Sequence, residues 1–391
     1  MNFTLIRGVS VHAPTPQGKN DLLLGAGRII AVGPRIEPPS WMDVQVVHAE
    51  GLLAVPGLID LHVHLIGGGG EMGPSSRCPE ATLATLTTAG ITTVVGVMGT
   101  DSETRHLSSL LAKVRALETE GITAYMYTGA YYVPSPTLTG SVQRDLVLID
   151  KVVGVKLAVS DHRSSQPTFE EISRVAAEAR VGGMLGGKPG IVHVHVGGGK
   201  RGLGPLRDLV ERTEIPISQL LPTHLLRDKT LFDQAMEWVS LGGFVDFTTS
   251  SAPRTDGLSP RRALKLMGDA GLDLSHVTWS TDAQGSLPRF DPSTGKATGL
   301  LVGSPGSLLE EVRRAVLDEG ISLADALAPV TTNPAARLGL EATKGRVAPG
   351  YDADLLLLDG ETLALNSVWA RGERMVADGR PLQIGLFDRS E

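Results

Sequence analysis

The chain has 391 residues, enough for one large domain with a smaller appendage. Hydrophobic residues make up 41% and charged residues 20%, which is ordinary globular usage and argues against a disordered or fibrous protein. The net charge of −7, without a basic cluster interleaved with aromatic residues, argues against a nucleic-acid partner. The single cysteine, Cys78, excludes an intrachain disulfide and a zinc site built from cysteines.

The N-terminal segment MNFTLIRGVSVHAP shows no targeting pattern, because no basic region is followed by an apolar stretch. Nowhere do about 18 apolar residues run together, as a membrane-spanning helix requires. The sequence therefore predicts a cytoplasmic protein without a membrane partner.

The two ends of the chain share one sequence pattern. Residues 1–55 carry short alternating segments separated by glycine turns, and residues 345–391 return to that pattern. Alternation with period two is typical of strands with one buried face. We expect both ends to join in one small β-sandwich domain, and two unrelated β extensions are the alternative.

Residues 56–344 form the larger predicted domain, in which short β-rich runs alternate with helical patterns. Helical segments such as 109–121 have apolar spacing near 3.6 and end at glycine. Eight β-rich runs, several of them almost continuously apolar, lie at 54–65, 91–98, 122–130, 151–160, 190–197, 217–224, 243–250 and 276–282. Eight such units predict an α/β fold of the (β/α)8 TIM-barrel type.

Reactive groups in such a barrel lie at the C-terminal ends of the strands. An H-x-H pair ends the first predicted strand, and period two points both imidazoles the same way. A lone H-x-H pair is weak evidence, but polar residues recur at or near later strand ends. The candidate positions are His62, His64, Lys156, His195, His224 and Asp282.

Four imidazoles and a carboxylate exceed what one tetrahedral site holds with a position left open, so two divalent metal ions are expected rather than one. Lys156 lies in an apolar strand, where burial lowers the pKa of an amine and makes the neutral form available. A neutral amine can react with carbon dioxide to give a carbamate. From the residues alone, a snorkelling lysine is the alternative for Lys156.

Five motifs carry a resemblance to a known family: PGLIDLHVHLIGGGGE, TGAYYVPS, GVKLAVSDHRS, LLPTH and STDAQGS. Together they resemble the isoaspartyl dipeptidases of the amidohydrolase superfamily over essentially the whole barrel. The tail GRVAPGYDADLLLLD is similar to the general C-terminal pattern of that superfamily. The GGGGE and SDHRS segments narrow the resemblance from the superfamily to the dipeptidases.

The resemblance implies a metallopeptidase that hydrolyses β-aspartyl (isoaspartyl) dipeptides. It implies a binuclear centre of the zinc type, with Lys156 carboxylated, and a homo-oligomer, for which it suggests an octamer. The implied metal ligands are His62, His64, Lys156, His195, His224 and Asp282. The implied substrate contacts are Gly69, Gly70, Glu71, Thr100, Tyr131, Arg163, Arg227 and Ser286.

These implied roles agree with the chemistry of the substrate. A dipeptide linked through an aspartate side chain keeps a free α-ammonium and two carboxylates, so Glu71 can pair the ammonium while Arg163 and Arg227 each clamp a carboxylate. The expected mechanism is attack by a hydroxide that bridges two metals. Asp282 would move the protons. Tyr131 would hydrogen-bond the developing oxyanion.

Two features depart from the family pattern. His193 precedes the expected ligand His195 by two residues and faces the same way, so we interpret it as a core or supporting histidine. Ala283-Gln284 follows Asp282 where glycine or asparagine types are expected, a change that could alter the floor of the pocket without touching a ligand. The alternatives are a cyclic-amide hydrolase of the dihydroorotase or hydantoinase type, which would not need Glu71, and a non-catalytic scaffold, which would be expected to lack some ligands.

Overall fold

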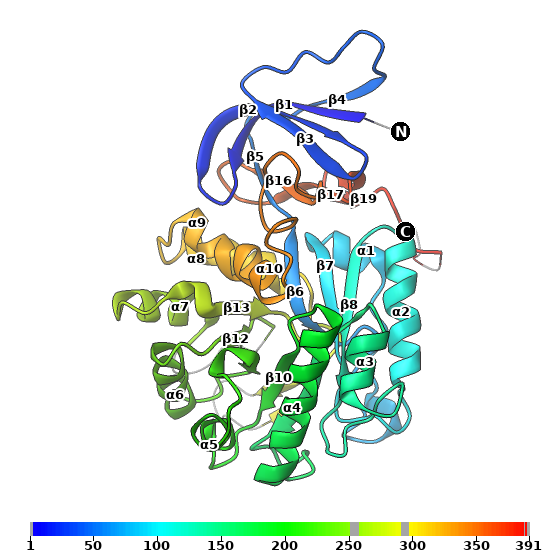
Figure 1. Ribbon diagram of the computed structural model, residues 1–391. Coiled ribbons are helices and arrows are strands. Elements are labelled where there is room, and N and C mark those ends of the chain that lie inside the picture. Colours follow the sequence, from blue (N-terminus) through cyan, green and yellow to red (C-terminus); the bar gives the residue numbers. More distant parts are fainter. Residues whose placement is uncertain (1–2, 251–257, 291–296, 387, 389–391) are drawn as a thin grey trace.

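The computed structural model describes residues 3–250, 258–290, 297–386 and 388. A β-rich part, built from both ends of the chain, lies above a larger part in which strands alternate with helices (Figure 1). Within the described ranges, no helix is both long and apolar enough to cross a membrane.

All eight strands predicted between residues 54 and 282 are present. Six form one parallel sheet in chain order, and the last two form a parallel pair. Their bounds are β6 (Leu58–Val63), β7 (Ile91–Gly96), β8 (Thr123–Gly129), β9 (Val152–Val159), β10 (Ile191–Val196), β11 (Leu220–Thr223), β12 (Val245–Thr248) and β13 (Val277–Ser280). Every residue of β6, β7, β9 and β10 is buried, as expected for strands covered on both faces.

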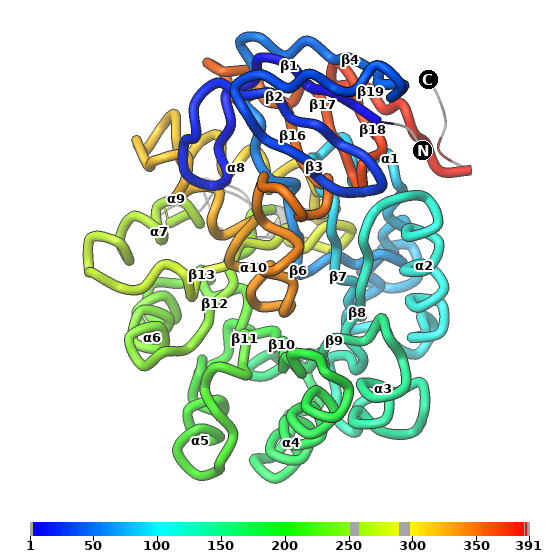
Figure 2. Tube along the Cα trace, turned by 45° about the horizontal axis from the view of Figure 1, so that its top comes forward, coloured from blue at the N-terminus to red at the C-terminus, as the bar shows by residue number. Residues whose placement is uncertain are grey.

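The parallel sheet is curled. Strand β11 lies beside β12, and the residues that follow β13 are hydrogen-bonded to β6. The amide of Asp282 donates to the His62 carbonyl at 3.0 Å, and the amide of His64 donates to the Ala283 carbonyl at 2.9 Å. Figure 2 shows β6 to β13 following one another around a curve, with α2 to α7 on the outside. The ends of β6 and β13 are thereby held side by side.

Helices connect the strands and cover the outer face of the sheet. They are α1 (Leu83–Thr87), α2 (Leu107–Thr119), α3 (Val142–Leu148), α4 (Phe169–Gly186), α5 (Gly204–Arg212), α6 (Lys229–Ser240), α7 (Pro260–Asp269), α8 (Ser307–Leu317), α9 (Leu323–Leu327) and α10 (Thr332–Arg337). Single 3-10 turns lie at Pro74–Ser76, Ile217–Gln219, Leu274–His276 and Ala328–Val330.

Helix α4 illustrates how local sequence sets these boundaries. Thr168 and Glu171 form a capping box at its start, which satisfies backbone donors that have no partner inside the helix. The helix ends at Gly187, whose φ of 63° lies in the left-handed region that glycine adopts without strain. Its buried face carries Ile172, Val175, Ala176 and Ala179.

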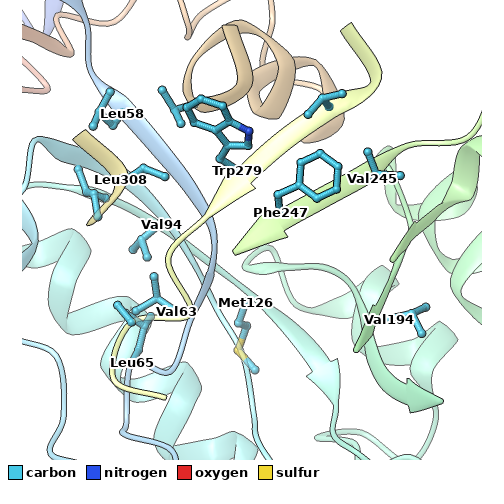
Figure 3. Close-up of a cluster of buried hydrophobic side chains, with 14 of the residues drawn as sticks. Leu58, Val63, Leu65, Val94, Met126, Val194, Val245, Phe247, Trp279 and Leu308 are labelled. Atoms are coloured by element: carbon cyan, nitrogen blue, oxygen red, sulfur yellow. The ribbon is translucent and has the colours of Figure 1, made fainter. Parts of the chain in front are cut away.

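The main core lies between the curled sheet and its helices. Strand residues such as Leu58, Val94, Met126, Val194, Phe247 and Trp279 belong to this core, together with Leu308 of helix α8 (Figure 3). Burying a side chain of this size stabilises the fold by about 1.5–3 kcal/mol. Because neighbouring strand residues point to opposite faces, the same strands direct their other residues toward the inside of the curl.

The two chain ends share one nine-stranded sheet, in the order β19-β18-β17-β16-β5-β1-β2-β3, with β4 paired to β1. The N-terminal strands are β1 (Phe3–His12), β2 (Pro16–Gly25), β3 (Arg28–Gly33), β4 (Val44–His48) and β5 (Leu52–Pro56). The C-terminal strands are β16 (Leu355–Asp359), β17 (Leu365–Ala370), β18 (Glu373–Ala377) and β19 (Arg380–Pro381). The antiparallel pairing of β5 with β16 joins the ends, so two unrelated extensions are wrong. The sandwich arrangement stays a prediction.

A buried ion-pair cluster anchors this sheet to the larger part. Lys344 lies 2.8 Å from the Asp352 carboxylate and also contacts Asp354. Asp354 accepts a hydrogen bond from the Arg371 amide at 2.7 Å, while its carbonyl accepts one from the Gly57 amide at 2.9 Å. The polar residues of the tail motif therefore hold together the segments that enter and leave the larger part.

Lys344→Met should lower the free energy of unfolding by about 3–5 kcal/mol, because it leaves the buried Asp354 carboxylate without its cation, while Asp352 keeps Arg28 at 2.7 Å. The matched control is Lys229→Met, which removes an exposed ion pair with Asp233. That change should cost less than about 1 kcal/mol. Chemical denaturation of both variants measures the difference, and equal losses would contradict the anchoring role.

Candidate metal centre and active site

Residues at the C-terminal ends of the strands meet inside the curl. His62 is in β6 and His64 directly follows that strand, while Asp282 lies two residues past β13. Asp282 and His224 adopt φ values of 55° and 66°, a left-handed conformation that residues other than glycine adopt at a cost. Such strained positions concentrate at functional sites, because the surrounding structure must hold them in place.

His62, His64 and Asp282 form a compact group of metal-type donors. Each offers one ligand atom, and these atoms lie within 4.8 Å of one another. The Nε2 atoms of His62 and His64 lie 3.4 and 3.1 Å from the same oxygen, Oδ1 of Asp282. All three residues are buried, so this trio could hold a divalent cation away from bulk water.

Lys156 lies beside this trio. Its Nζ is 3.4 Å from Nδ1 of His62, and the residue has no exposed surface. A snorkelling lysine is therefore wrong, since the ammonium end does not reach solvent. Burial lowers the pKa of Lys156 to about 7, although the Asp282 and Asp246 carboxylates act in the opposite direction. A large fraction of the amine is therefore neutral at neutral pH, and the neutral amine is the form that reacts with carbon dioxide.

His224 completes the inner wall. Its ring lies 5.2 Å from the His62 ring and 4.6 Å from the His195 ring, centroid to centroid. Its Nδ1 lies 2.6 Å from the Thr248 hydroxyl, which orients the imidazole. Its buried Nε2 has no hydrogen-bond partner among the described residues. An oriented imidazole with a free inward nitrogen has the features of a metal ligand.

His195 is held from both sides. Its Nδ1 lies 2.6 Å from the Tyr131 hydroxyl, and its Nε2 lies 2.8 Å from the Asp161 carboxylate. Asp161 also binds Arg163, through Nε at 3.0 Å and Nη2 at 2.9 Å. One carboxylate thus positions both a predicted ligand and a predicted substrate contact.

His193 contacts the same group, as expected for a supporting histidine. Its Nε2 lies 2.8 Å from Nδ1 of His62, and its ring stacks on Tyr127 with centroids 4.9 Å apart. In the β9–β10 register it stands directly opposite Lys156. His193 is therefore placed to orient His62 rather than to fill a remote core position.

Burial dominates the electrostatics. It lowers the pKa of His62, His193, His195 and His224 well below the usual value, which keeps these imidazoles neutral and able to act as ligands. Burial alone would raise the pKa of Asp161, but hydrogen bonds to His195 and Arg163 outweigh it and hold that pKa far below the usual range.

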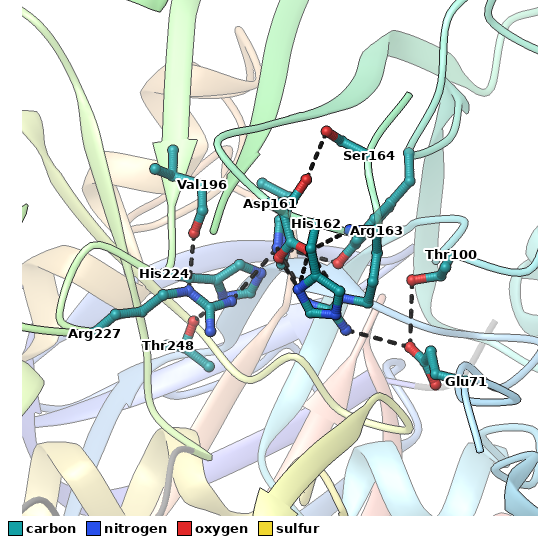
Figure 4. Close-up of polar contacts among 12 residues, drawn as sticks. Glu71, Thr100, Asp161, His162, Arg163, Ser164, Val196, His224, Arg227 and Thr248 are labelled. Atoms are coloured by element: carbon teal, nitrogen blue, oxygen red, sulfur yellow. Dashed lines mark hydrogen bonds and ion pairs between the residues drawn. The ribbon is translucent and has the colours of Figure 1, made fainter. Parts of the chain in front are cut away.

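The predicted substrate residues line the approach to this group. Glu71 Oε1 lies 3.3 Å from the Thr100 hydroxyl and 3.4 Å from Nη1 of Arg163, as Figure 4 shows. Arg227 donates from Nε to the Val196 carbonyl at 2.9 Å, and its Nη2 lies 3.5 Å from Nε2 of His195. Charged groups of both signs therefore stand next to the metal-type donors.

The remaining predicted contacts lie in two loops. Gly69 and Gly70 precede Glu71 with φ values of 76° and 105°. A Cβ at Gly69 would come within 2.3 Å of the Ser76 carbonyl, so this turn requires glycine. Ser286 begins β14 (Ser286–Phe290), which pairs with β15 (Ala297–Val302). Among the described residues, no hydrogen bond joins the Ser286 side chain to the metal-type donors, although the preceding Gly285 lies against Asp282 and His64.

Sequence analysis gave no role to two buried acids, Asp60 and Asp246. Asp246 accepts hydrogen bonds from three hydroxyls, those of Thr223, Thr278 and Ser280. Asp60 binds Thr281, and burial raises its pKa to about 7. The sequence pattern could have indicated Asp60, because it precedes His62 by two residues and so lies on the same face of the strand.

Comparison with known proteins agrees with this geometry. The model of the amidohydrolase family matches residues 53–379, which run from β5 to just beyond β18. The chain belongs to the amidohydrolase family. The family predicted from the sequence motifs is thereby confirmed, and the match spans the metal-type donors.

The β-aspartyl dipeptidase of Fervidobacterium islandicum AW-1, solved in complex with β-Asp-Leu, is 44% identical. The match covers 97% of this chain and 98% of that one, with a TM-score of 0.89. A D-hydantoinase structure is 19% identical, covers 99% of this chain and 98% of its own, and has a TM-score of 0.68. At that identity the hydantoinase shows a shared fold only.

Curated relatives are more distant. Adenine deaminase 1 of Latilactobacillus sakei subsp. sakei (strain 23K) is 24% identical over 355 residues, which is 90% of this chain but 54% of that protein. The adenine deaminase of Paracoccus denitrificans (strain Pd 1222) is also 24% identical, with 97% of this chain and 58% of that protein covered. The chain thus spans little more than half the length of these deaminases.

Asp161→Asn should weaken divalent-metal binding by about 10–100-fold, because an amide no longer stabilises and orients His195 as the carboxylate does. Chelator competition on the purified protein measures this affinity. Glu170→Gln is the matched control, since this exposed acid in the first turn of α4 undergoes the same carboxylate-to-amide change and should leave metal affinity unchanged. Unaltered affinity in Asp161→Asn would exclude Asp161 as a positioning group for a ligand.

Proposed function

We propose that the protein is a binuclear metal-dependent dipeptidase that hydrolyses β-aspartyl dipeptides. One observation carries the proposal: Glu71 and Arg163, a carboxylate and a guanidinium, stand beside a buried group of metal-type donors. The 44% identity to a β-aspartyl dipeptidase bound to β-Asp-Leu, over almost the whole chain, supports the same substrate class.

The proposed metals are two divalent ions of the zinc type. Six residues would hold them: His62, His64, Lys156 as a carbamate, His195, His224 and Asp282. The free Nε2 of His224 and the convergence of two imidazoles on one Asp282 oxygen support this fit. When bound, the ions would supply Lewis-acid polarisation of the scissile carbonyl and activation of the attacking water.

Electrostatics support a carbamate on Lys156. A buried cationic lysine among four imidazoles would repel two metal ions, whereas a carbamate adds a negative charge where the donors converge. Its lowered pKa, about 7, supports a reactive amine at neutral pH. Carbamate and Asp282 would then partly neutralise the four positive charges of the ions.

The residues of the chain perform the remaining steps. Asp282 would accept the proton of the attacking water and deliver it to the leaving amine, since its Oδ1 lies at the centre of the site. Burial raises the pKa of Tyr131, so this phenol keeps its proton and can donate to the developing oxyanion. Tyr131 is also positioned by its contact with His195.

The proposed substrate head group fits the charges around the donors. Glu71 would bind the free α-ammonium, and Arg163 and Arg227 would each bind a carboxylate, with Thr100, Ser286 and the amides near Gly69 and Gly70 completing the pocket. The 3.4 Å contact between Glu71 and Arg163 pairs the two charges to each other. A substrate that brings one ammonium and two carboxylates would replace that pair with stronger contacts.

A cyclic-amide hydrolase is the second candidate, because such enzymes use the same kind of metal centre. A cyclic-amide hydrolase would not need Glu71, since a cyclic amide presents no free α-ammonium. The likeness to D-hydantoinase concerns the fold alone. A non-catalytic scaffold is disfavoured because all six expected donors are present and most converge.

The architecture is part of the same proposal. We expect a closed (β/α)8 barrel over residues 56–344 and a β-sandwich domain formed by residues 1–55 and 345–391. The contacts of β13 with β6 and of β11 with β12 support closure. The assembly into a homo-oligomer, with an octamer as the suggested size, and the cytoplasmic location stay predictions.

Glu71→Gln should raise KM for β-Asp-Leu by about 10–100-fold, because a buried ammonium loses its counter-charge. The wild-type enzyme should cleave β-Asp-Leu far faster than α-Asp-Leu and should not open dihydroorotate. The control is Glu103→Gln, an exposed acid that binds the Tyr132 hydroxyl, which should leave KM unchanged. Ring-opening activity without β-aspartyl cleavage would favour the second candidate.

Lys156→Arg should abolish turnover, since a guanidinium stays charged and cannot take up carbon dioxide. Lys156→Ala should also be inactive, but short carboxylic acids at high concentration should restore part of its rate by occupying the vacated space. In wild-type protein, ¹³C-labelled bicarbonate should give a carbamate signal that both variants lack. Near-normal turnover of Lys156→Arg with two bound metals would falsify the carbamate.

A further inference from the structure

The hairpin of β14 and β15 begins directly beside the metal-type donors. Its register pairs Leu287 with Leu301 and Pro288 with Leu300. The amide of Gly303 donates to the Gly285 carbonyl at 2.9 Å, which continues the pairing toward Asp282 beyond the two strands. The pair of Gly285 and Gly303 therefore forms the base of the hairpin.

This base pair lies against the proposed metal centre. A Cβ at Gly285 would come within 2.7 Å of Oδ1 of Asp282 and within 3.0 Å of the His64 ring. A Cβ at Gly303 would collide with the Asp282 carbonyl. Both glycines thus turn the same face of the hairpin toward Asp282, and neither has room for a side chain there.

Leu287 and Leu301 are the next residues on that face. Opposite residues of an antiparallel pair share a face, and residues two apart along a strand return to it, so these leucines follow Gly285 and Gly303 on one side. Two residues of strand advance about 7 Å. The leucine pair therefore begins roughly one side-chain length outward from Asp282.

Both leucines leave apolar surface open. Leu301 is 45% exposed and Leu287 is half-buried, although leucine is among the residues most often buried completely. Among the described residues, neither leucine belongs to a buried core or packs against one. An open apolar pair beside polar donors favours an apolar part of a ligand at this place.

The role proposed for Asp282 decides which part of a dipeptide lies here. Asp282 would deliver a proton to the leaving amine, so the leaving residue begins next to this carboxylate. Glu71, Arg163 and Arg227 would bind the charged groups of the dipeptide. The side chain of the leaving residue is the one part that none of these contacts holds.

We propose that Leu287 and Leu301 form the subsite for the side chain of the leaving residue and give the enzyme a preference for aliphatic residues there. This inference rests on the proposed function, because it needs a dipeptide bound at the donors. An aliphatic side chain would pack on both leucines and remove apolar surface from water. A glycine would gain nothing from this wall, and an acidic side chain would lose hydration against it.

The test compares kcat/KM for β-Asp-Leu and β-Asp-Gly with the metal-loaded, full-length enzyme. The wild type should favour β-Asp-Leu by at least about tenfold. Leu301→Ser should lower kcat/KM for β-Asp-Leu by about tenfold and leave the value for β-Asp-Gly within about twofold, because glycine has no side chain to contact the wall. Unchanged turnover of β-Asp-Gly also reports a folded, metal-loaded variant.

Leu300→Ser is the matched control. Leu300 precedes Leu301 in β15 and is 38% exposed, but it points to the opposite face of the hairpin. Both substrates should therefore keep their wild-type kcat/KM in this variant. Leu301→Asp should go further and favour β-Asp-Lys over β-Asp-Leu, a gain of specificity that a folding defect cannot produce.

The outcomes separate the subsite from the proposed function. Equal losses for both dipeptides in Leu301→Ser, or a larger loss of selectivity in Leu300→Ser, would overturn the subsite while β-aspartyl cleavage by the wild type still stands. A changed oligomeric state of Leu301→Ser in sedimentation, with unaltered selectivity, would assign Leu301 to a subunit contact and also reject it. Cleavage of neither dipeptide by the wild type would refute the proposed function, and the subsite with it.

Discussion

The structure depends on one costly arrangement, a lysine and five imidazoles buried together in one place. Burial lowers the pKa of Lys156 to about 7 and lowers the pKa of His62 well below its usual value. Donor atoms such as Nε2 of His224 have no hydrogen-bond partner among the described residues, and each such atom costs about 1–3 kcal/mol. The hydrophobic core between the curled sheet and its helices must offset this cost.

The sheet built from the chain ends contributes to that stability. β5 pairs with β16 in this sheet and then leads, through Gly57, directly into β6, the strand that carries His62. A Cβ at Gly57 would come within 2.3 Å of the Thr92 hydroxyl, so the chain passes very close to β7 at this point. The buried Lys344 cluster fixes the same junction from the C-terminal side. Strand β6 is therefore held firmly at its start, which limits movement of His62 near its far end.

Much of this arrangement could be predicted from the sequence, because period-two and period-3.6 patterns reflect burial directly. All eight strands formed where apolar runs predicted them, and most predicted ligands converge as expected for strand ends. Lone inward acids such as Asp246 give no periodic signal of their own, so their hydrogen-bond networks could not be assigned. The β14–β15 hairpin was also missed, since Pro288 and short runs give weak strand patterns. Whether the end sheet forms a sandwich depends on how it curls, which local sequence does not determine.

The loop carboxylate Asp161 shows how recognition and chemistry can be connected within this fold. A continuous chain of contacts runs from Glu71 through Arg163 and Asp161 to His195 and then to Tyr131. A ligand that separates Glu71 from Arg163 changes the charge felt by Asp161, and Asp161 orients the imidazole beside the phenol. Because these contacts are buried or half-buried, solvent screens them weakly and a change at one end is felt at the other. A ligand that binds between Glu71 and Arg163 would therefore change the position of the Tyr131 phenol, and under the proposed function a correctly charged dipeptide would help to align that group.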